Sequence, residues 1–443
     1  MINPTEMSSA PDPVTLLQRL ITFDTTNPPG DEALCIEYIR EILTGAGIST
    51  QTVAREPARP NLIARLEGRG EAPPLLLYAH VDVVPTTGQA WDHPPFSGEI
   101  ANGFVWGRGA LDCKSGISMM ITALVRAAAE GLKPSGDILF AALADEEAGG
   151  VYGAKFLVEE HPELFAGVRY AISEFGGFTM QLAGKTVMPI MIAEKQTCAV
   201  KATVHGAGGH GSMPVRNGSM AELARVLQIL DRHRLPVHIT PEARTMFHAL
   251  GDALGGLTGF VMRQLLNPAL TNPLLSLLGE KARLFSPLLH NSVSVTMLQG
   301  SQVINVIPDE IALGLDGRLL PGQRDEDLIR ELRALLGPDV TLEVVHVIEP
   351  PPPTDMGLFD TLSDILRESN PEAFPVPYLL AGATDGRHFS RLGIQTYGFL
   401  PMQLPPDFKF TEVIHTRNER IPVDAVTFGA DAMYRLLQRL PAG

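Results

Sequence analysis

Residues 75–84 have the sequence LLLYAHVDVV, an apolar run of the length and composition typical of a strand that is buried on both faces. NLIARL at 61–66 and DILFAALA at 137–144 are runs of the same kind, and a helix is predicted over 115–131. This alternation predicts an α/β fold with a mainly parallel sheet that is flanked by helices on both faces. Functional side chains of such sheets gather at the carboxyl ends of the strands, so we expect the acidic and histidine clusters described below at such ends.

The pattern changes near residue 196. Alternating apolar and polar residues in TCAVKATVHG (197–206), SVSVTMLQG (292–300) and EIALGLDGRLL (310–320) predict half-exposed strands, and helices are predicted over 219–233 and 325–336. A Pro-rich segment at 349–354 then leads back to a helix, strand and helix pattern. We therefore expect a small α+β domain at 196–350, inserted into a first domain that comprises 1–195 and 351–443.

Composition excludes several classes of protein. The 443 residues include 35 basic and 50 acidic ones, and this net charge of −15 argues against binding to nucleic acid, which needs a basic surface. Hydrophobic residues make up 45% of the chain, enough for a large core. The three cysteines cannot all pair with one another, and residues 1–13 lack the features of a secretory signal peptide. Both observations predict a cytoplasmic protein.

The most apolar region, residues 249–289, predicts helices without a membrane span. Charged residues, Asn and Pro interrupt it, so no window offers about 20 unbroken apolar residues. We expect a buried or interfacial set of helices there, and contact with lipid is the alternative.

A histidine and two acidic residues lie at or after the end of the strand predicted at 75–84. His80 and Asp82 end the strand at 75–84, where residues two apart point the same way, so the carboxylate can fix the tautomer of a metal-binding imidazole. The alternative is a hydrogen-bonded pair that closes the strand. Asp112 precedes the helix predicted at 115–131, and its alternative role is that of a helix N-cap.

Further acids and a histidine complete the set. Asp145, Glu146 and Glu147 follow the strand at 137–144 directly, and such neighbours repel one another unless a cation lies among them. Glu174 ends the apolar stretch RYAISE, and His415 lies shortly before the last predicted helix. Mixed histidine and carboxylate donors suit zinc, cobalt or manganese, whereas a solvated acidic loop and a structural histidine are the alternatives.

A glycine-rich stretch at 206–211, GAGGHG, matches the G-x-G-x-x-G pattern of dinucleotide-binding loops. That pattern should open a helix at once, but Ser212, Met213 and Pro214 keep the chain in a loop. Dinucleotide binding is therefore not expected.

Several motifs in a fixed order resemble those of the M20 metallopeptidase family: HVDVVP, GRGALDCKSG, ADEEAGG, SEFGG and HTRNERIPV. GAGGHGSMP, NVIPDE and GATDGRHF also fit, so the resemblance covers nearly the whole chain. The family includes aminoacylases, glutamate carboxypeptidase, succinyl-diaminopimelate desuccinylase, and di- and tripeptidases. The resemblance implies a catalytic domain with two divalent metal ions, and an inserted ferredoxin-like α+β domain that serves as a lid and forms a homodimer.

The resemblance also assigns roles by position. It gives His80 and Glu174 to one metal ion, Glu147 and His415 to the other, and Asp112 to both as a bridge. Glu146 is implied to be the general base, and Asp82 the partner of the His80 imidazole. His210 is implied to reach from the lid to the active site of the partner subunit. The implied substrate contacts are Asn305, Arg318, Thr384 and Arg387. Cys113 departs from the Asp, Asn or Met that the family often has after the bridging residue, and its side chain is not expected to bind metal.

The reaction implied is hydrolysis of an amide bond, most simply in N-acyl amino acids, by a water activated between two metal ions with Glu146 as the general base. Zinc is the expected metal, with cobalt or manganese as alternatives. Arg318 and Arg387 could clamp a substrate carboxylate or form structural salt bridges. The apolar insertion at 243–290 resembles the branch of the family that acts on long acyl chains, and core packing is its alternative role. A metallo-carboxypeptidase or dipeptidase and a non-catalytic binding protein of the same fold are the competing functions.

Overall fold

The computed structural model describes residues 10–441, and the chain forms two compact units. The first comprises the chain up to Ile192 together with Thr354–Tyr378 and the segment from Thr384 onward, and the second comprises Ala193–Pro353 and Leu379–Ala383. The assignment of these units as a catalytic domain and a lid domain stays a prediction.

A nine-stranded mixed sheet forms the centre of the first unit. The strands, in spatial order, are β1 (Ser49–Ala54), β2 (Pro60–Leu66), β6 (Ile138–Leu143), β3 (Leu75–His80), β7 (Tyr170–Ser173), β17 (Gln395–Gly398), β9 (Lys185–Glu194) and β16 (Phe374–Leu380), with β8 (Met180–Leu182) beside β9. The four strands from β6 to β17 are parallel, whereas β1, β2 and β9 run antiparallel to their neighbours. The predicted α/β fold is confirmed, and the parallel strands β3 and β6 are fully buried, as their apolar sequences require.

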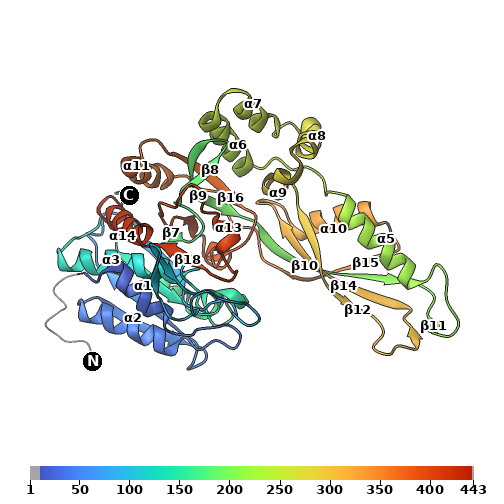
Figure 1. Ribbon diagram of the computed structural model, residues 1–443, viewed down its shortest axis with the longest axis horizontal. Helices are drawn as coiled ribbons and strands as arrows, with labels where there is room; N and C mark the ends of the chain where they lie inside the picture. Colours follow the sequence, from blue (N-terminus) through green and yellow to red (C-terminus); the bar gives the residue numbers. More distant parts are fainter. Residues whose placement is uncertain (1–9, 442–443) are drawn as a thin grey trace. The chain divides into compact units, whose positions relative to one another are not determined.

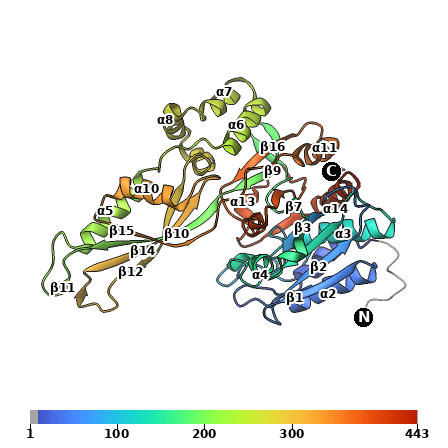
Figure 2. The same cartoon turned by 180° about the vertical axis from the view of Figure 1, so that it is seen from behind.

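Helices cover both faces of this sheet. The elements involved are α1 (Pro13–Ile21), α2 (Ala33–Gly45), α3 (Lys114–Ala129), α4 (Ala154–Glu160), α11 (Phe359–Ser369) and α14 (Val423–Gln438). Helices α1, α3 and α14 pack together in front of the sheet in Figure 1, and α4 lies on the side seen in Figure 2. Tyr78 of β3 and Phe156 of α4 belong to one core cluster. A small antiparallel sheet of β4 (Ile100–Ala101), β5 (Phe104–Trp106) and β18 (Arg420–Pro422) completes the unit.

The second unit has a ferredoxin-like core, as the family resemblance implies. Its four antiparallel strands have the order β12 (Ser292–Gln299), β14 (Glu310–Leu319), β10 (Gln196–His205) and β15 (Thr341–Val347). Helices α5 (Ser219–Arg232) and α10 (Asp325–Leu336) pack against the sheet (Figure 1). Burial alternates along β14, so the inward side chains, among them Leu313 and Leu315, form the core.

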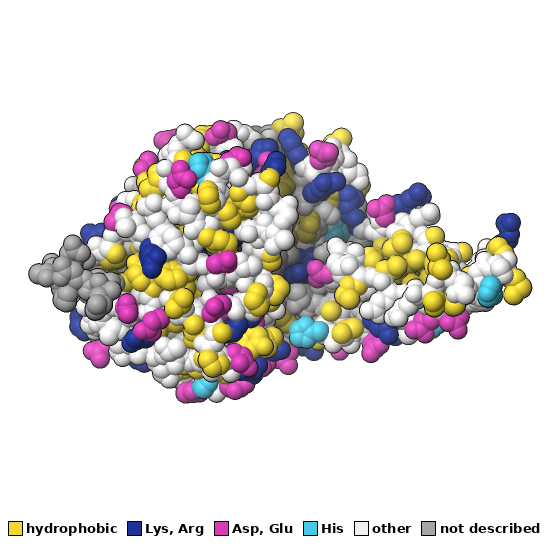
Figure 3. Space-filling view, turned by 60° about the horizontal axis from the view of Figure 1, so that its bottom comes forward, with side chains coloured by type: hydrophobic (Ala, Val, Ile, Leu, Met, Phe, Trp, Pro, Cys, Tyr) yellow, Lys and Arg dark blue, Asp and Glu magenta, His cyan; other side chains and the backbone are white. Residues whose placement is uncertain are grey.

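The apolar region at 249–289 forms helices in the second unit, between α5 and β12. They are α6 (Pro241–Leu254), α7 (Gly256–Gln264), α8 (Pro268–Leu278) and α9 (Ala282–Phe285). Phe247 and Phe285 are buried against each other, whereas Leu257 and Leu277 are 78% and 83% exposed. Across residues 10–441, none of the helices is both long and apolar enough to span a bilayer. On the face drawn in Figure 3, acidic and basic side chains lie interspersed.

Candidate metal centre

His80 is the last residue of β3, and its imidazole is buried among acidic groups. Its Nε2 lies 2.9 Å from Oδ1 of Asp112 and 3.5 Å from Oε2 of Glu174. Its Nδ1 lies 2.9 Å from the backbone oxygen of Asp82 and 3.5 Å from the Oδ1 atom of that residue. Asp82 therefore orients the ring, chiefly through its main chain, and directs Nε2 toward the two other carboxylates.

Asp112 lies in the loop between β5 and α3. The N-cap of α3 is Cys113, which makes no side-chain capping bond, so the alternative of Asp112 as a helix cap is wrong. The backbone N–H groups of Leu111 and Asp112 donate to Oε1 of Glu419 over 2.8 and 3.1 Å. The Asp112 carboxylate is thereby free to point inward, where it contacts two histidines.

Glu174 directly follows β7, the parallel neighbour of β3, so its carboxylate comes to the same edge of the sheet as His80. Donor atoms of His80, Asp112, Glu174 and Cys113 lie within 4.8 Å of one another, and all four residues are buried. The first group of donors therefore contains the three residues that the resemblance names, with the Cys113 thiol beside them.

The three consecutive acids after β6 point in different directions. Asp145 has a left-handed backbone (φ 67°), and its buried carboxylate accepts a hydrogen bond from Arg59 over 3.0 Å. Arg59 is thus the cation that the acidic run requires, although it approaches only one of the three. The N–H groups of Glu146 and Glu147 donate to the two carboxylate oxygens of Asp82, each over 3.1 Å. Asp82 therefore fixes the turn that carries Glu146 and Glu147.

His415 completes a second group of donors with Asp112 and Glu147. Its Nε2 lies 2.8 Å from Oδ2 of Asp112 and 3.3 Å from Oε1 of Glu147, and the three donor atoms lie within 4.8 Å of one another. Asp112 is common to both groups. Neither Asp112 nor His415 ends a parallel strand, which corrects the expectation that all members of the set do: both lie in loops, which the pairing of β5 with β18 brings together.

Proximity of like charges perturbs the acids of the site. Burial and the neighbouring Asp112 raise the pKa of Glu174 to about 8. Burial and the charge of Glu174 raise the pKa of Glu146 well above its usual range. Glu174 and Glu146 thus tend to retain protons, whereas the hydrogen bonds of His415 and His80 outweigh burial and lower the pKa of Asp112.

The imidazoles show the complementary effect. The carboxylates of Asp112 and Glu147 raise the pKa of His415 to about 10. Burial disfavours the charged form of His80, but its contacts with Asp112 and other carboxylates outweigh this and raise its pKa well above the usual value. Protons therefore supply the positive charge that the carboxylates require.

The donor set fits divalent cations. Both imidazole Nε2 atoms face carboxylates, an arrangement in which a cation can replace a proton. Oε1 of Glu147 is buried and, within the part of the chain that is described, accepts no hydrogen bond. Nitrogen and oxygen donors in two groups that share one carboxylate match the ligands that zinc, cobalt and manganese take.

Comparison with known proteins identifies the family of this chain. The family model "Peptidase family M20/M25/M40" matches residues 76–439. The chain belongs to this family. It is an amide-bond hydrolase of the metallopeptidase type, and the alternative of a non-catalytic binding protein is thereby set aside.

Three relatives show the breadth of the M20 family around this chain. Mouse (Mus musculus) N-fatty-acyl-amino acid synthase/hydrolase PM20D1 is 28% identical over 402 residues, which cover 87% of this chain and 78% of that protein. A probable carboxypeptidase S-like protein of Dictyostelium discoideum is 27% identical over 401 residues, which cover 86% of this chain and 74% of that protein. The crystal structure of an M20 metallo-carboxypeptidase from Sulfolobus solfataricus shares the fold with a TM-score of 0.70 at 17% identity, over 97% of this chain and 99% of that one.

Two of the expected substrate contacts lie in the first unit, at the start of α12 (Gly386–Phe389). The Thr384 hydroxyl is buried and accepts a hydrogen bond from the N–H of Gly386 over 3.0 Å. Arg387 donates from Nε to Nε2 of His388 over 3.2 Å. Among the described residues, Arg387 forms no ion pair with a carboxylate, so its guanidinium is available to a substrate anion.

The other two expected substrate contacts, Asn305 and Arg318, lie in the second unit together with the lid residue His210. His210 is exposed and lies 2.7 Å from the Ser212 hydroxyl through Nδ1. The short pairing of β11 (Gly209–His210) with β13 (Val306–Ile307) brings Asn305 close to it, since the Gly211 N–H donates to the Asn305 oxygen over 2.8 Å. Arg318 instead forms an ion pair with Asp316 on the same strand, at 2.9 Å.

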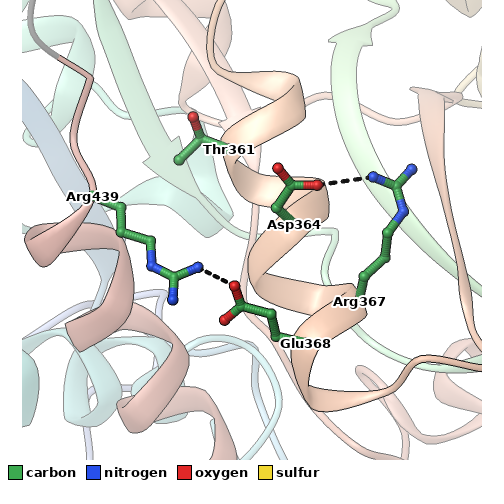
Figure 4. Close-up of a pocket in the computed structure, with 5 residues that line it drawn as sticks. All are labelled: Thr361, Asp364, Arg367, Glu368 and Arg439. Atoms are coloured by element: carbon green, nitrogen blue, oxygen red, sulfur yellow. Dashed lines mark hydrogen bonds and ion pairs between the residues drawn. The ribbon is translucent and has the colours of Figure 1, made fainter.

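Sequence reasoning missed several residues that support the site. Asn27 donates from Nδ2 to Asp82 over 2.8 Å and to Asp145 over 3.0 Å, and Arg59 bridges Asp145 and Glu32. No local pattern marks these residues, because each contacts the site from a distant part of the chain. The pocket of about 360 Å³ drawn in Figure 4 contains none of the site residues; it lies between α11 and the end of α14, where ion pairs join Asp364 to Arg367 and Glu368 to Arg439.

Proposed function

We propose that this protein hydrolyses the amide bond of N-acyl amino acids with two divalent metal ions, zinc in the simplest case. The observation that carries the proposal is the pair of donor groups that share Asp112: His80 and Glu174 on one side, Glu147 and His415 on the other. Each group would hold one ion, with Asp112 as the bridge. Two such ions would polarise an amide carbonyl and lower the pKa of a water molecule.

Glu146 is the general base of this proposal. It is adjacent in sequence to Glu147 and belongs to neither donor group, and burial together with the charge of Glu174 raises its pKa well above its usual range. Both observations support the role of a base beside the metal position. Its carboxylate accepts the proton of the attacking water and returns it to the leaving amine. Asp82 contributes by orienting His80 and by fixing the backbone of Glu146 through its N–H group.

The proposed substrate carries a carboxylate that Arg387 binds. A guanidinium takes a carboxylate through two parallel hydrogen bonds, and Arg387 is the one of the two expected arginines that lacks an acidic partner within the described chain. Thr384 adds a further contact in this proposal. Arg318 is a weaker candidate because Asp316 occupies its guanidinium.

A long acyl chain is the proposed second half of the substrate. Helices α7 and α8 expose Leu257, Phe260, Leu270 and Leu277, apolar surface that an acyl chain could cover. Each buried CH₂ would contribute about 0.8 kcal/mol to binding. The relative named as an N-fatty-acyl-amino acid synthase/hydrolase supports this substrate class, and the carboxypeptidase S-like relative supports the alternative of a peptide substrate.

We further propose that the protein is a cytoplasmic homodimer. β12 is an edge strand of its sheet and exposes Val295, Met297 and Leu298, so an edge-to-edge pairing with the partner's β12 would cover backbone and apolar surface together. In such a dimer His210 and Asn305 would act at the partner's active site, where His210 would donate a hydrogen bond to the oxyanion. Three free, buried cysteines are consistent with a reducing compartment.

The decisive experiment measures amino-acid release from N-acyl amino acids, from acetyl to long acyl, with dipeptides alongside. Mass spectrometry detects the product with and without a chelator. Release that is lost with chelator and rises with acyl length is the expected result. Release from dipeptides only would replace the proposal with a peptidase, and release that survives complete removal of metal would overturn the metal mechanism.

A further inference from the structure

Two buried side chains outside both donor groups connect the loops that carry Asp112 and His415. Arg108 is 1% exposed and Glu419 is 0% exposed. Nη1 of Arg108 donates to Oε2 of Glu419 over 2.6 Å, so they form a buried ion pair. The two residues are far apart in sequence, and the antiparallel pairing of Arg420 in β18 with Trp106 in β5 makes them neighbours.

Glu419 binds the backbone of the Asp112 loop. Its Oε1 accepts hydrogen bonds from the N–H groups of Leu111 and Asp112, over 2.8 and 3.1 Å. The backbone of Glu419 also contributes, because its oxygen accepts from the N–H of Gly107 over 3.0 Å. One carboxylate therefore fixes the main chain at the residue that both donor groups share.

Arg108 binds the backbone of the His415 loop. It donates from Nη1 to the Thr416 oxygen over 3.2 Å and from Nη2 to the His415 oxygen over 3.5 Å. Gln89 supports the same carbonyl, since its Nε2 lies 3.4 Å from the His415 oxygen while its Oε1 accepts from Arg108 over 2.9 Å. His415 has a left-handed backbone (φ 59°), which a non-glycine residue adopts only where its surroundings compensate for the strain.

We infer that the Arg108–Glu419 pair is a positioning device that sets the distance between Asp112 and His415, and with it the affinity of the second metal position. The inference rests on the proposed function, because it assumes that Asp112, Glu147 and His415 bind a cation. Arg108 binds the His415 side of that position, and within residues 10–441 neither His80 nor Glu174 forms a hydrogen bond or ion pair with Arg108 or Glu419. Loss of the Arg108 guanidinium should therefore weaken metal binding at the second position and leave metal binding at the first position unchanged.

The substitution that tests this is Arg108→Lys. Lysine keeps the positive charge opposite Glu419 but has a single ammonium group, which cannot bond to two carbonyls and Gln89 at once. Changes in groups that orient metal ligands typically reduce metal affinity 10- to 100-fold. Gln89→Ala removes one support of the His415 carbonyl without leaving a buried charge, and should reduce the affinity in the same direction by less.

Arg65→Lys is the control at a more exposed arginine, whose side chain is 54% exposed against 1% for Arg108. Like Glu419, the partner carboxylate Asp137 accepts hydrogen bonds both from its arginine, Arg65, and from a backbone N–H group, that of Gly68 over 2.8 Å. The pair lies in the same unit. The pair takes part in neither donor group. If Arg108 does not position His415, Arg108→Lys should bind metal as the wild type and Arg65→Lys do.

The experiment is a cobalt(II) titration of the metal-free full-length protein, followed by visible absorption and by metal analysis after dialysis. The wild type and Arg65→Lys should bind two ions. Arg108→Lys should bind the first with unchanged affinity and the second 10- to 100-fold more weakly, with a lower kcat and little change in KM. Two ions bound by Arg108→Lys and Gln89→Ala with wild-type affinity would overturn the inference, even if thermal stability falls. Fewer than two ions in the wild type would instead refute the proposed function.

Discussion

Glu146 and Glu147 are adjacent carboxylates for which we predict different roles, and isosteric substitution separates them. Glutamine keeps the size of either side chain and removes only its charge and basicity. The backbone N–H of each residue binds Asp82, and this contact does not depend on the side chain. Glu146→Gln should therefore leave the turn and both donor groups in place, whereas Glu147→Gln replaces a member of the second group.

The expected magnitude for Glu146→Gln follows from the loss of a general base, which is worth about 100- to 10,000-fold in rate. This corresponds to about 2.7–5.4 kcal/mol of transition-state stabilisation. Folding stability of the metal-free protein should not fall. Burial and the charge of Glu174 raise the pKa of Glu146, so a neutral side chain relieves repulsion there.

The assay combines kcat and KM, from amino-acid release, with the number of metal ions bound after dialysis. Glu146→Gln should retain two ions and an unchanged KM while kcat collapses. Glu147→Gln should lose one ion and recover part of its rate when excess metal is supplied. If Glu146→Gln keeps more than about a tenth of the wild-type kcat, the expected range for a general base is not reached and its role is refuted.

Four further results are expected. Metal binding should release protons and should strengthen as pH rises from 6 toward 9, because the folded, metal-free protein has a raised pKa of about 8 for Glu174 and of about 10 for His415. Calorimetry in buffers of different ionisation enthalpy measures the released protons. For the same reason the metal-free protein alone should lose stability as pH rises through these values, which urea unfolding at several pH values checks. Asn27→Asp replaces two donated hydrogen bonds with a third carboxylate beside Asp82 and Asp145, and should reduce the free energy of unfolding by about 3–6 kcal/mol in urea titrations. Gly398→Ala places a Cβ 2.3 Å from the backbone oxygen of Glu174, and should reduce the free energy of unfolding by about 1–3 kcal/mol. Cobalt binding should weaken as well, because Glu174 must shift; unchanged cobalt binding would show that it does not.

The supports of the site illustrate what local sequence could not reveal. The need of the acidic run at 145–147 for a cation was foreseeable, but the cation is Arg59, which directly precedes β2, the antiparallel neighbour of β6. Arg108 and Glu419 are separated by more than 300 residues, and only the pairing of β5 with β18 makes them partners. An isolated charged residue carries no signal of the partner that tertiary structure will supply.

The sequence by itself determined the strands, the helices and the residue types available for chemistry. Hydrophobic periodicity is a local property, so the buried run at 75–84 predicts β3 and the alternation at 310–320 predicts β14. The expectation of a parallel sheet also placed His80 and Glu174 at one edge of that sheet, since parallel strands end on the same side.

Only the tertiary structure decided how the second group assembles. Asp112 and His415 lie in irregular loops, whose course depends on hydrogen bonds from distant residues and not on a repeating pattern. The same holds for the different orientations of Asp145, Glu146 and Glu147, which a single left-handed residue and two N–H groups bound to Asp82 establish. Charge and spacing could nominate Asp112, Glu147 and His415, but packing across the whole first unit brings their donor atoms within 4.8 Å of one another.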